Sequence, residues 1–312
     1  MQSSKSFGDL FPVLNGEQAF DLYEQVKKAL PAATFPDTSR QCASLLDVTD
    51  EVDVFVFDAF GVLNVGEVPI PRAVERIQDL RALGKQVFVL TNAASFNRDE
   101  TFQKFVKLGF EFSHNELITS RRAAELDLAE FGPEHTWGVA STDSFQVTDL
   151  QAKCEVLADD AEIYENVSAF LFLSVQSWTE NRQQLLEASL KDNPRPVVIA
   201  NPDIVAPRGE TFSTEPGYFG HRLMSLYGTD VHFHGKPFAS VFELVEQKID
   251  LSEVDRNRIC MVGDTLHTDV LGGAARGWRT ALVTDHGLFK GLEPEKYISK
   301  SGIRPDWMVG SI

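Results

Sequence analysis

The 312-residue sequence contains few cysteines and no long apolar run. Its three cysteines, Cys42, Cys154 and Cys260, lie far apart and form no CxxC pair, which argues against a disulfide framework or a zinc knuckle. No stretch approaches the ~20 apolar residues of a membrane-spanning helix, and residues 1–15 lack the apolar segment of a signal peptide. We therefore expect a cytoplasmic protein with no membrane partner.

Basic residues are also scarce, with 29 Lys and Arg against 46 Asp and Glu and a formal net charge of −17. Proteins that bind nucleic acid over an extended surface hold its phosphates with Lys and Arg, so this balance argues against a nucleic-acid partner. It still permits a small anionic substrate, because one cation in a cleft can outweigh a distant acidic surface.

Strand and helix patterns alternate along the chain. Residues 54–57 (VFVF) are consecutively apolar, which is typical of a strand covered on both faces in a parallel sheet. A helical pattern runs from Pro71 to Gly84, and a second strand pattern covers 86–90. The order strand, helix, strand predicts an α/β fold with a Rossmann-like, doubly wound parallel sheet.

The same alternation returns near the C-terminus, in a helix and strand at 239–248 and 259–262 and again at 269–276 and 279–283. Shorter strand patterns between the two sets, with one helix at 180–191, predict an inserted α/β domain. We expect these parts: an N-terminal helical extension at 1–50, a core domain made of 51–131 and 232–312, and the inserted domain at 132–231.

Polar residues follow the ends of three predicted strands. Asp58 follows the first strand, Thr91 and Asn92 follow the second, and Asp264 follows the strand at 259–262. Ligands of open parallel sheets bind at the carboxyl ends of the strands, so we expect these groups along one edge. Each acid alone has a second interpretation, because acids at strand ends are also common turn and helix-cap residues.

One lysine completes the set. Lys236 stands between Gly235 and Pro237, just before a predicted helix, where backbone N–H groups also favour an anion. A phosphoryl centre needs a nucleophile, hydroxyl or amide donors, a cation, and carboxylates for a hard metal. The strand-end residues and Lys236 together supply each of these groups.

These residues resemble, in order and spacing, the four motifs of the haloacid dehalogenase (HAD) superfamily. The four segments are Asp58-Ala59-Phe60-Gly61-Val62-Leu63, Leu90-Thr91-Asn92, Gly235-Lys236-Pro237, and Gly263-Asp264 with Thr268-Asp269. The last two are similar to those of the p-nitrophenyl-phosphatase and phosphoglycolate-phosphatase-like group, subfamily IIA, whose members carry a large α/β cap after the second motif. The resemblance covers about residues 52–290.

The resemblance implies a magnesium-dependent hydrolase. Asp58 would be the nucleophile, forming an aspartyl-phosphate that water then hydrolyses. Magnesium would be held by Asp58, Asp264 and the backbone carbonyl of Phe60, with Asp269 orienting the metal site directly or through water.

The same resemblance implies that Thr91 and Asn92 donate hydrogen bonds to the transferring group, while Lys236 binds both that group and the nucleophile. The substrate would be a small phosphorylated metabolite selected by the cap. Four cap residues are candidates for a second anionic contact: Arg182, Arg195, Arg208 and Arg222. A homodimer through the cap is an additional open expectation.

Phe60 departs from the phosphatase pattern, which has an Asp two residues after the nucleophile. That Asp protonates the leaving group and then activates water, and phenylalanine can do neither. General acid–base catalysis contributes ~10²–10⁴-fold, so turnover should be slower without it.

Three explanations for Phe60 stay open. The enzyme is a phosphatase restricted to good leaving groups, or one with another proton carrier such as His267. It is a displacement enzyme like the haloacid dehalogenases, which have a similar Asp-x-Tyr-Gly pattern. Or it is a vestigial protein that binds phosphorylated ligands without efficient turnover. Asp264, Asp269 and the long insertion weaken the dehalogenase interpretation, since halide displacement needs no magnesium-site acids.

Overall fold

The computed structural model describes residues 7–208 and 211–312 of the chain. The chain divides into two units, and each is described by itself. The core unit comprises Lys27–Thr91, Arg98–Ile118 and Lys236–Ile312. The insert unit comprises the described residues up to Val26, Asn92–Asn97 and Thr119–Gly235.

The bounds of the inserted part differ from the expectation. Residues 92–97 and 232–235, expected in the core, lie in the insert unit, and so do residues 119–131. The reason is packing: helix α4 (Ser120–Glu130) places Ala124 and Leu128 in one apolar cluster with Trp137 and Leu171 of the insert sheet.

The expected N-terminal extension is also divided between the units, after Val26. Before this point, the Tyr23 hydroxyl accepts a hydrogen bond from the Ile204 amide of the insert unit, at 3.1 Å. After it, the Lys27 ammonium donates to the Ser301 carbonyl of the core unit. The described part of the expected extension, residues 7–50, is thus shared between the two units.

The core unit is built on a seven-stranded sheet with the order β1-β16-β15-β14-β2-β5-β6. The central strand β2 (Val54–Phe57) has four buried residues, as its continuous apolar sequence predicts, and pairs in parallel with β14 and β5. The other strands are β1 (Arg40–Gln41), β5 (Gln86–Thr91), β6 (Leu117–Thr119), β14 (Ile259–Gly263), β15 (Arg279–Val283) and β16 (Trp307–Val309).

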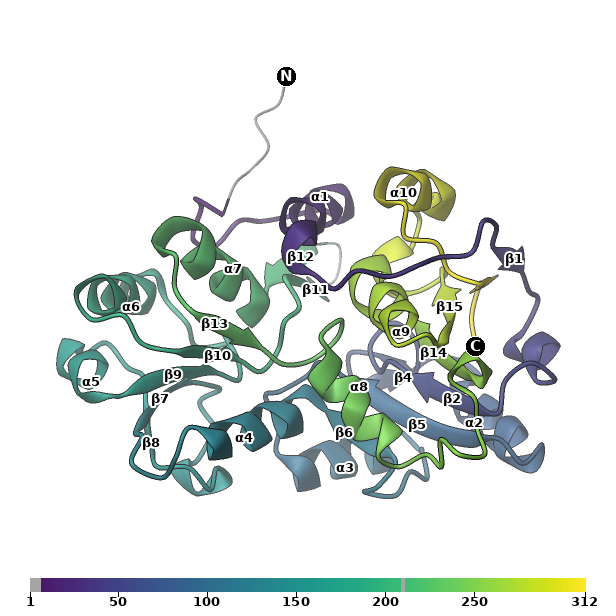
Figure 1. Cartoon of the computed structure of the whole chain (residues 1–312), viewed down its shortest axis with the longest axis horizontal. Coiled ribbons are helices and arrows are strands. Elements are labelled where there is room, and N and C mark those ends of the chain that lie inside the picture. Colours follow the sequence, from purple (N-terminus) through teal and green to yellow (C-terminus); the bar gives the residue numbers. More distant parts are fainter. Residues whose placement is uncertain (1–6, 209–210) are drawn as a thin grey trace. The chain divides into compact units, whose positions relative to one another are not determined.

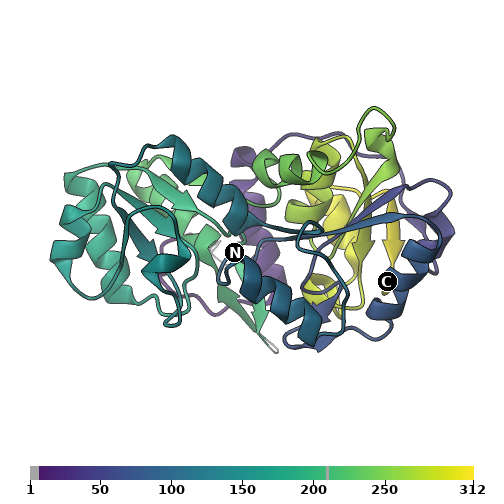
Figure 2. The ribbon, with the colours of Figure 1, turned by 90° about the horizontal axis from the view of Figure 1, so that it is seen from below.

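Helices cover both faces of the core sheet (Figure 2). They are α2 (Ala73–Ala82), α3 (Arg98–Lys107), α8 (Ala239–Glu246), α9 (Leu271–Ala275) and α10 (Pro294–Ser301). Ile77 of α2 shares an apolar cluster with Phe55 and Phe57, whereas Gly273 of α9 lies against Met261 of β14. Gly84 has a φ of +76°, the left-handed conformation that follows the end of α2.

Short elements complete the core unit. The hairpin strands β3 (Asn64–Val65) and β4 (Val68–Pro69) follow β2. Single turns of 3-10 helix occupy Lys27–Ala29, Leu45–Val48, Arg256–Arg258 and Gly287–Phe289, and a π-helical turn occupies Leu266–Val270.

The insert unit contains a five-stranded parallel sheet with the order β13-β10-β9-β7-β8. Its strands are β7 (Trp137–Ala140), β8 (Cys154–Val156), β9 (Ala169–Phe172), β10 (Val197–Ile199) and β13 (Val231–Phe233). Figure 1 shows α6 (Glu180–Asp192) and α7 (Pro216–Tyr227) on one side of this sheet and α4 on the other.

The remaining elements of the insert unit are α1 (Gly16–Val26), a 3-10 turn at Val147–Asp149, α5 (Ala161–Asn166), and the antiparallel strands β11 (Val205–Arg208) and β12 (Thr211–Thr214). Two helix-covered parallel sheets confirm the predicted α/β fold class. Within the described residues, no helix combines the length and apolar character needed to span a bilayer.

Candidate functional site

Asp58 lies at the carboxyl end of β2, the central strand of the core sheet. Its amide donates to the Val262 carbonyl at 2.8 Å, which extends the pairing with β14 to this residue. The Ala59 amide donates to Asp58 Oδ1 at 2.7 Å, and the Asp58 side chain is 14% exposed. The carboxylate is therefore fixed at the strand end and remains accessible.

Lys236 is buried between two carboxylates. Its Nζ lies 2.6 Å from Asp58 Oδ1 and 2.7 Å from Asp269 Oδ1. Burial alone would lower the pKa of Lys236, but the negative charges of Asp269 and Asp58 outweigh burial and raise this pKa above its ordinary value. The lysine therefore keeps its positive charge although its side chain is only 2% exposed.

Asp58, Asp264 and Asp269 each offer a carboxylate oxygen, and these three oxygens lie within 4.8 Å of one another. Asp264 Oδ2 accepts from the Leu288 amide at 2.8 Å, and Asp269 Oδ2 accepts from the Thr265 amide at 3.0 Å. Backbone donors thus fix the orientation of both carboxyl groups.

Burial controls the protonation of these two acids. It raises the pKa of Asp264 well above its usual range, and the charges of Asp58 and Asp269 raise it further. Burial also raises the pKa of Asp269 to about 6, although the charge of Lys236 opposes that rise. Three carboxyl groups around one lysine form an oxygen-rich, negatively charged pocket, the donor set that suits a hard divalent cation such as Mg²⁺.

Two glycines leave room for the Asp264 carboxylate. A Cβ added to Gly61 would lie 2.8 Å from Asp264 Cγ, and one added to Gly287 would lie 1.8 Å from Asp264 Oδ2. Both glycines have positive φ, +78° and +63°, so conformation and space both require the absence of a side chain.

If these carboxylates hold Mg²⁺, Gly287→Ala should weaken its binding by about tenfold or more, because the new methyl group displaces the Asp264 carboxylate from its position. Isothermal titration with Mg²⁺ measures this change. Gly291→Ala is the matched control: Gly291 has a similar φ of +77°, but its Cβ would meet open space among the described residues. Equal affinities in the two variants would show that Asp264 does not bind the metal.

Phe60 lies half-buried in the turn that follows Asp58. The amides of Val62, Leu63 and Asn64 all donate to the Ala59 carbonyl in this turn, so none of these three bonds uses the Phe60 carbonyl. The expectation that this carbonyl binds the metal stays a prediction.

Thr91 and Asn92 stand at the end of β5 but fall in different units. Thr91 is the last residue of β5 and is buried in the core unit. The Asn92 side-chain amide donates to Asp203 Oδ1 at 2.8 Å, and the Asn92 carbonyl accepts from Ser120 Oγ at 2.8 Å, all within the insert unit. The sequence did not predict this role for Asn92, and its expected contact with the transferring group remains a prediction.

The sequence also singled out His267 and several arginines, and their surroundings differ. His267, the alternative proton carrier, is fully buried in the π-helical turn. Arg195 donates to the carbonyls of Tyr164 and Val167, and Arg222 pairs with Glu187 at 2.7 Å, so both guanidinium groups are used inside the insert unit. The side chain of Arg208 lies outside the described residues.

Two family models match segments of the chain. A family model described as haloacid dehalogenase-like hydrolase matches residues 55–149, and one described as HAD-hydrolase-like matches residues 233–312. Together the two models match more than half of the chain, and they contain all the segments that resemble the four motifs.

Curated relatives carry phosphatase names. The chain is 25% identical over 281 residues to the 4-nitrophenylphosphatase of Schizosaccharomyces pombe, covering 84% of this chain and 93% of that protein. It is 29% identical over 279 residues to mouse chronophin, covering 86% and 94%. These names agree with the subfamily that the sequence motifs predicted.

A solved structure from Cytophaga hutchinsonii, described as a possible sugar phosphatase of the HAD superfamily, shares the fold. Its TM-score is 0.76 at 24% identity, and the match covers 88% of this chain and 98% of that one. The shared fold therefore extends over residues of both the core and the insert units.

Proposed function

The chain belongs to the haloacid dehalogenase-like hydrolase family, and from this membership we propose that it is a magnesium-dependent phosphatase acting on a small phosphomonoester. The observation that carries the proposal is the buried bridge in which Lys236 contacts both Asp58 and Asp269 at the carboxyl edge of the core sheet. The phosphatase names of relatives that match over four fifths of the chain support the reaction class.

Asp58 is the proposed nucleophile. One of its carboxylate oxygens forms a bond to phosphorus while the bond from phosphorus to the leaving oxygen breaks, releasing an alkoxide or phenolate that takes any proton it needs from solvent water. Water then hydrolyses the aspartyl-phosphate, which regenerates the carboxylate and releases inorganic phosphate. Lys236, 2.6 Å from Asp58, is placed to attract the anionic phosphoryl group and hold it near the nucleophile.

Asp58, Asp264 and the Phe60 carbonyl would hold Mg²⁺, and three carboxylate oxygens within 4.8 Å of one another fit such an ion. When bound, the ion would neutralise the repulsion between an anionic nucleophile and an anionic substrate. Asp269 would act by positioning, because it holds Lys236 on one oxygen and the Thr265 amide on the other. Thr91 is the proposed hydroxyl donor to the phosphoryl group.

Phe60 determines which substrates such a site favours. A phenylalanine side chain cannot protonate a leaving alkoxide, so phosphate esters of acidic alcohols or phenols should react faster than alkyl phosphates. The best first substrate is therefore p-nitrophenyl phosphate, whose nitrophenolate leaves without a proton.

Removing the metal should stop this reaction. We expect hydrolysis of p-nitrophenyl phosphate, followed by absorbance, to be lost in EDTA and restored by excess Mg²⁺, because the carboxylates would then face the substrate without a neutralising ion. Activity that survives chelation and releases halide from 2-haloacids would instead identify a displacement enzyme. Absence of turnover, with thermal stabilisation by phosphorylated metabolites, would identify a binding protein.

A further inference from the structure

The insert sheet has a topology that creates a ligand crevice. The chain runs from β7 to its neighbour β8, returns past β7 to β9 on the other side, and continues outward to β10 and β13. All pairings are parallel. Where connections leave in opposite directions, here at β7 and β9, a crevice opens at the carboxyl ends of the strands, and ligands of open parallel sheets bind there.

A cavity of about 280 Å³ lies at this crevice, close to the lower end of the range for small-molecule sites. Most of its lining comes from the segments that follow the carboxyl ends of β7, β8 and β9. These residues are Ser141, Thr142, Asp143, Leu157, Ala158, Ser177 and Trp178.

Ser141 is the first residue after β7, and it lines the cavity. It is 9% exposed, and its buried Oγ has no hydrogen-bond partner in the described part of the chain. Such hydroxyls are rare, because burial removes their hydrogen bonds to water. Ser141 lines the cavity, so rotation of its side chain toward a molecule bound there would supply the missing bond.

The charges at the cavity indicate the chemistry of that ligand. Arg182 donates from Nε to Asp159 at 3.3 Å and from Nη1 to the Ser177 carbonyl at 2.7 Å, so its charge is already matched. Asp143, which accepts from Ser177 Oγ at 2.5 Å, adds a negative charge. This balance disfavours a phosphate or carboxylate. Hydroxyl and carboxylate groups beside an aromatic wall, Trp178, suit a neutral molecule with several hydroxyls.

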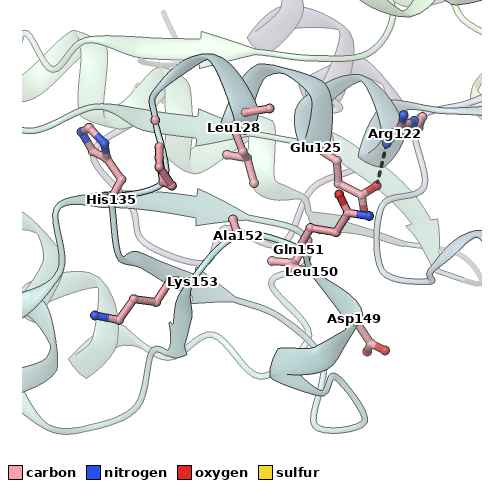
Figure 3. Close-up of a pocket in the computed structure, with 12 residues that line it drawn as sticks. Arg122, Glu125, Leu128, His135, Asp149, Leu150, Gln151, Ala152 and Lys153 are labelled. Carbon is pink, nitrogen blue, oxygen red and sulfur yellow. Dashed lines mark ion pairs between the residues drawn. The ribbon is translucent and has the colours of Figure 1, made fainter.

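A larger cavity in the same unit does not lie at the carboxyl ends of the strands. It measures about 530 Å³ and lies between α4 and residues 149–153, beside the amino ends of β7 and β8 (Figure 3). Its Arg122 pairs with Glu125 at 3.8 Å. Ligands of parallel sheets bind at the opposite, carboxyl ends, so this cavity serves as the internal control.

We propose that the cavity at the carboxyl ends of β7 and β9 binds a small neutral polyol or sugar through Ser141 and Asp143. The proposal concerns residues of the insert unit alone, and it goes beyond the proposed hydrolysis at Asp58. Binding of an unphosphorylated compound tests it whether or not the protein hydrolyses phosphate esters.

The test titrates the full-length protein with glycerol, glucose and myo-inositol, and separately with inorganic phosphate, by calorimetry and tryptophan fluorescence. At least one polyol should bind with a dissociation constant of about 10 mM or tighter. Ser141→Val, which removes the hydroxyl and fills space, should weaken binding by about tenfold or more, whereas Ser141→Thr keeps the hydroxyl and should retain more of the affinity.

Two further variants separate loss of the binding site from misfolding and from effects elsewhere in the insert unit. Asp143→Asn changes an exposed side chain, so it should fold normally and still weaken polyol binding by about threefold or more. Lys153→Ala, in the larger cavity, should leave binding unchanged. The proposal is overturned if no polyol binds, if Ser141→Val and Asp143→Asn bind as tightly as the wild type, or if phosphate is the ligand that these variants lose.

Discussion

Asp58→Asn is expected to lower kcat for p-nitrophenyl phosphate by about 10⁴-fold or more, because a neutral amide cannot replace the carboxylate as the nucleophile that forms the covalent intermediate. Asparagine keeps the shape of the side chain but loses the charge that pairs with Lys236 at 2.6 Å. Steady-state hydrolysis with excess Mg²⁺ measures the effect, and circular dichroism checks that the variant is folded.

Asp53→Asn is the matched control for this variant. Asp53 precedes the same strand, β2, at its amino end, where it pairs with Lys85 and Arg258. Its loss should change kcat less than about twofold, since a substitution remote from the reacting atoms does not alter transition-state binding. Comparable losses in the two variants, or substantial activity in Asp58→Asn, would rule out Asp58 as the nucleophile.

Phe60→Asp is expected to raise phosphatase activity by about tenfold or more, because it supplies the missing proton carrier two residues after the nucleophile. The increase should be larger for an alkyl phosphate than for p-nitrophenyl phosphate, since only the alkyl leaving group needs a proton. Comparison of kcat for glycerol 3-phosphate and p-nitrophenyl phosphate measures this difference.

Phe60→Asn separates proton transfer from the loss of the aromatic ring. Asparagine has nearly the shape of aspartate but cannot transfer a proton, so this variant should show no gain. Phe60 is half-buried, and thermal unfolding of both variants checks that the turn after β2 tolerates a polar side chain. If folded Phe60→Asp shows no gain, either another group already carries the proton or Asp58 is not the reacting carboxylate.

Local sequence patterns predicted the elements that bear the site. The run VFVF at 54–57 forms β2 with those same bounds, because four apolar residues in succession can be buried only where both faces of a strand are covered. The order of the motifs also predicted that Asp58, Lys236, Asp264 and Asp269 would meet, and the structure brings their side chains together. Their catalytic roles remain proposals.

The supporting contacts were not predictable from local patterns. The Leu288 amide that holds Asp264 lies 24 residues further along the chain, and any residue type except proline supplies such a donor. Asn92 and Asp203 are likewise joined across 111 residues of sequence. Strand β8 escaped prediction because Cys154–Val156 has no buried residue and so lacks an apolar signal.

The most direct test of the proposed mechanism is to observe the aspartyl-phosphate itself. Phe60 cannot activate water, so hydrolysis of the intermediate should be slow and the phosphorylated enzyme should accumulate. After p-nitrophenyl phosphate and Mg²⁺ are mixed with the wild-type protein and quenched in acid, peptide mass spectrometry should find one phosphoryl group on Asp58 and none in Asp58→Asn. Hydrolysis without a phosphoryl group on Asp58 at any time in a single turnover would contradict nucleophilic attack by Asp58.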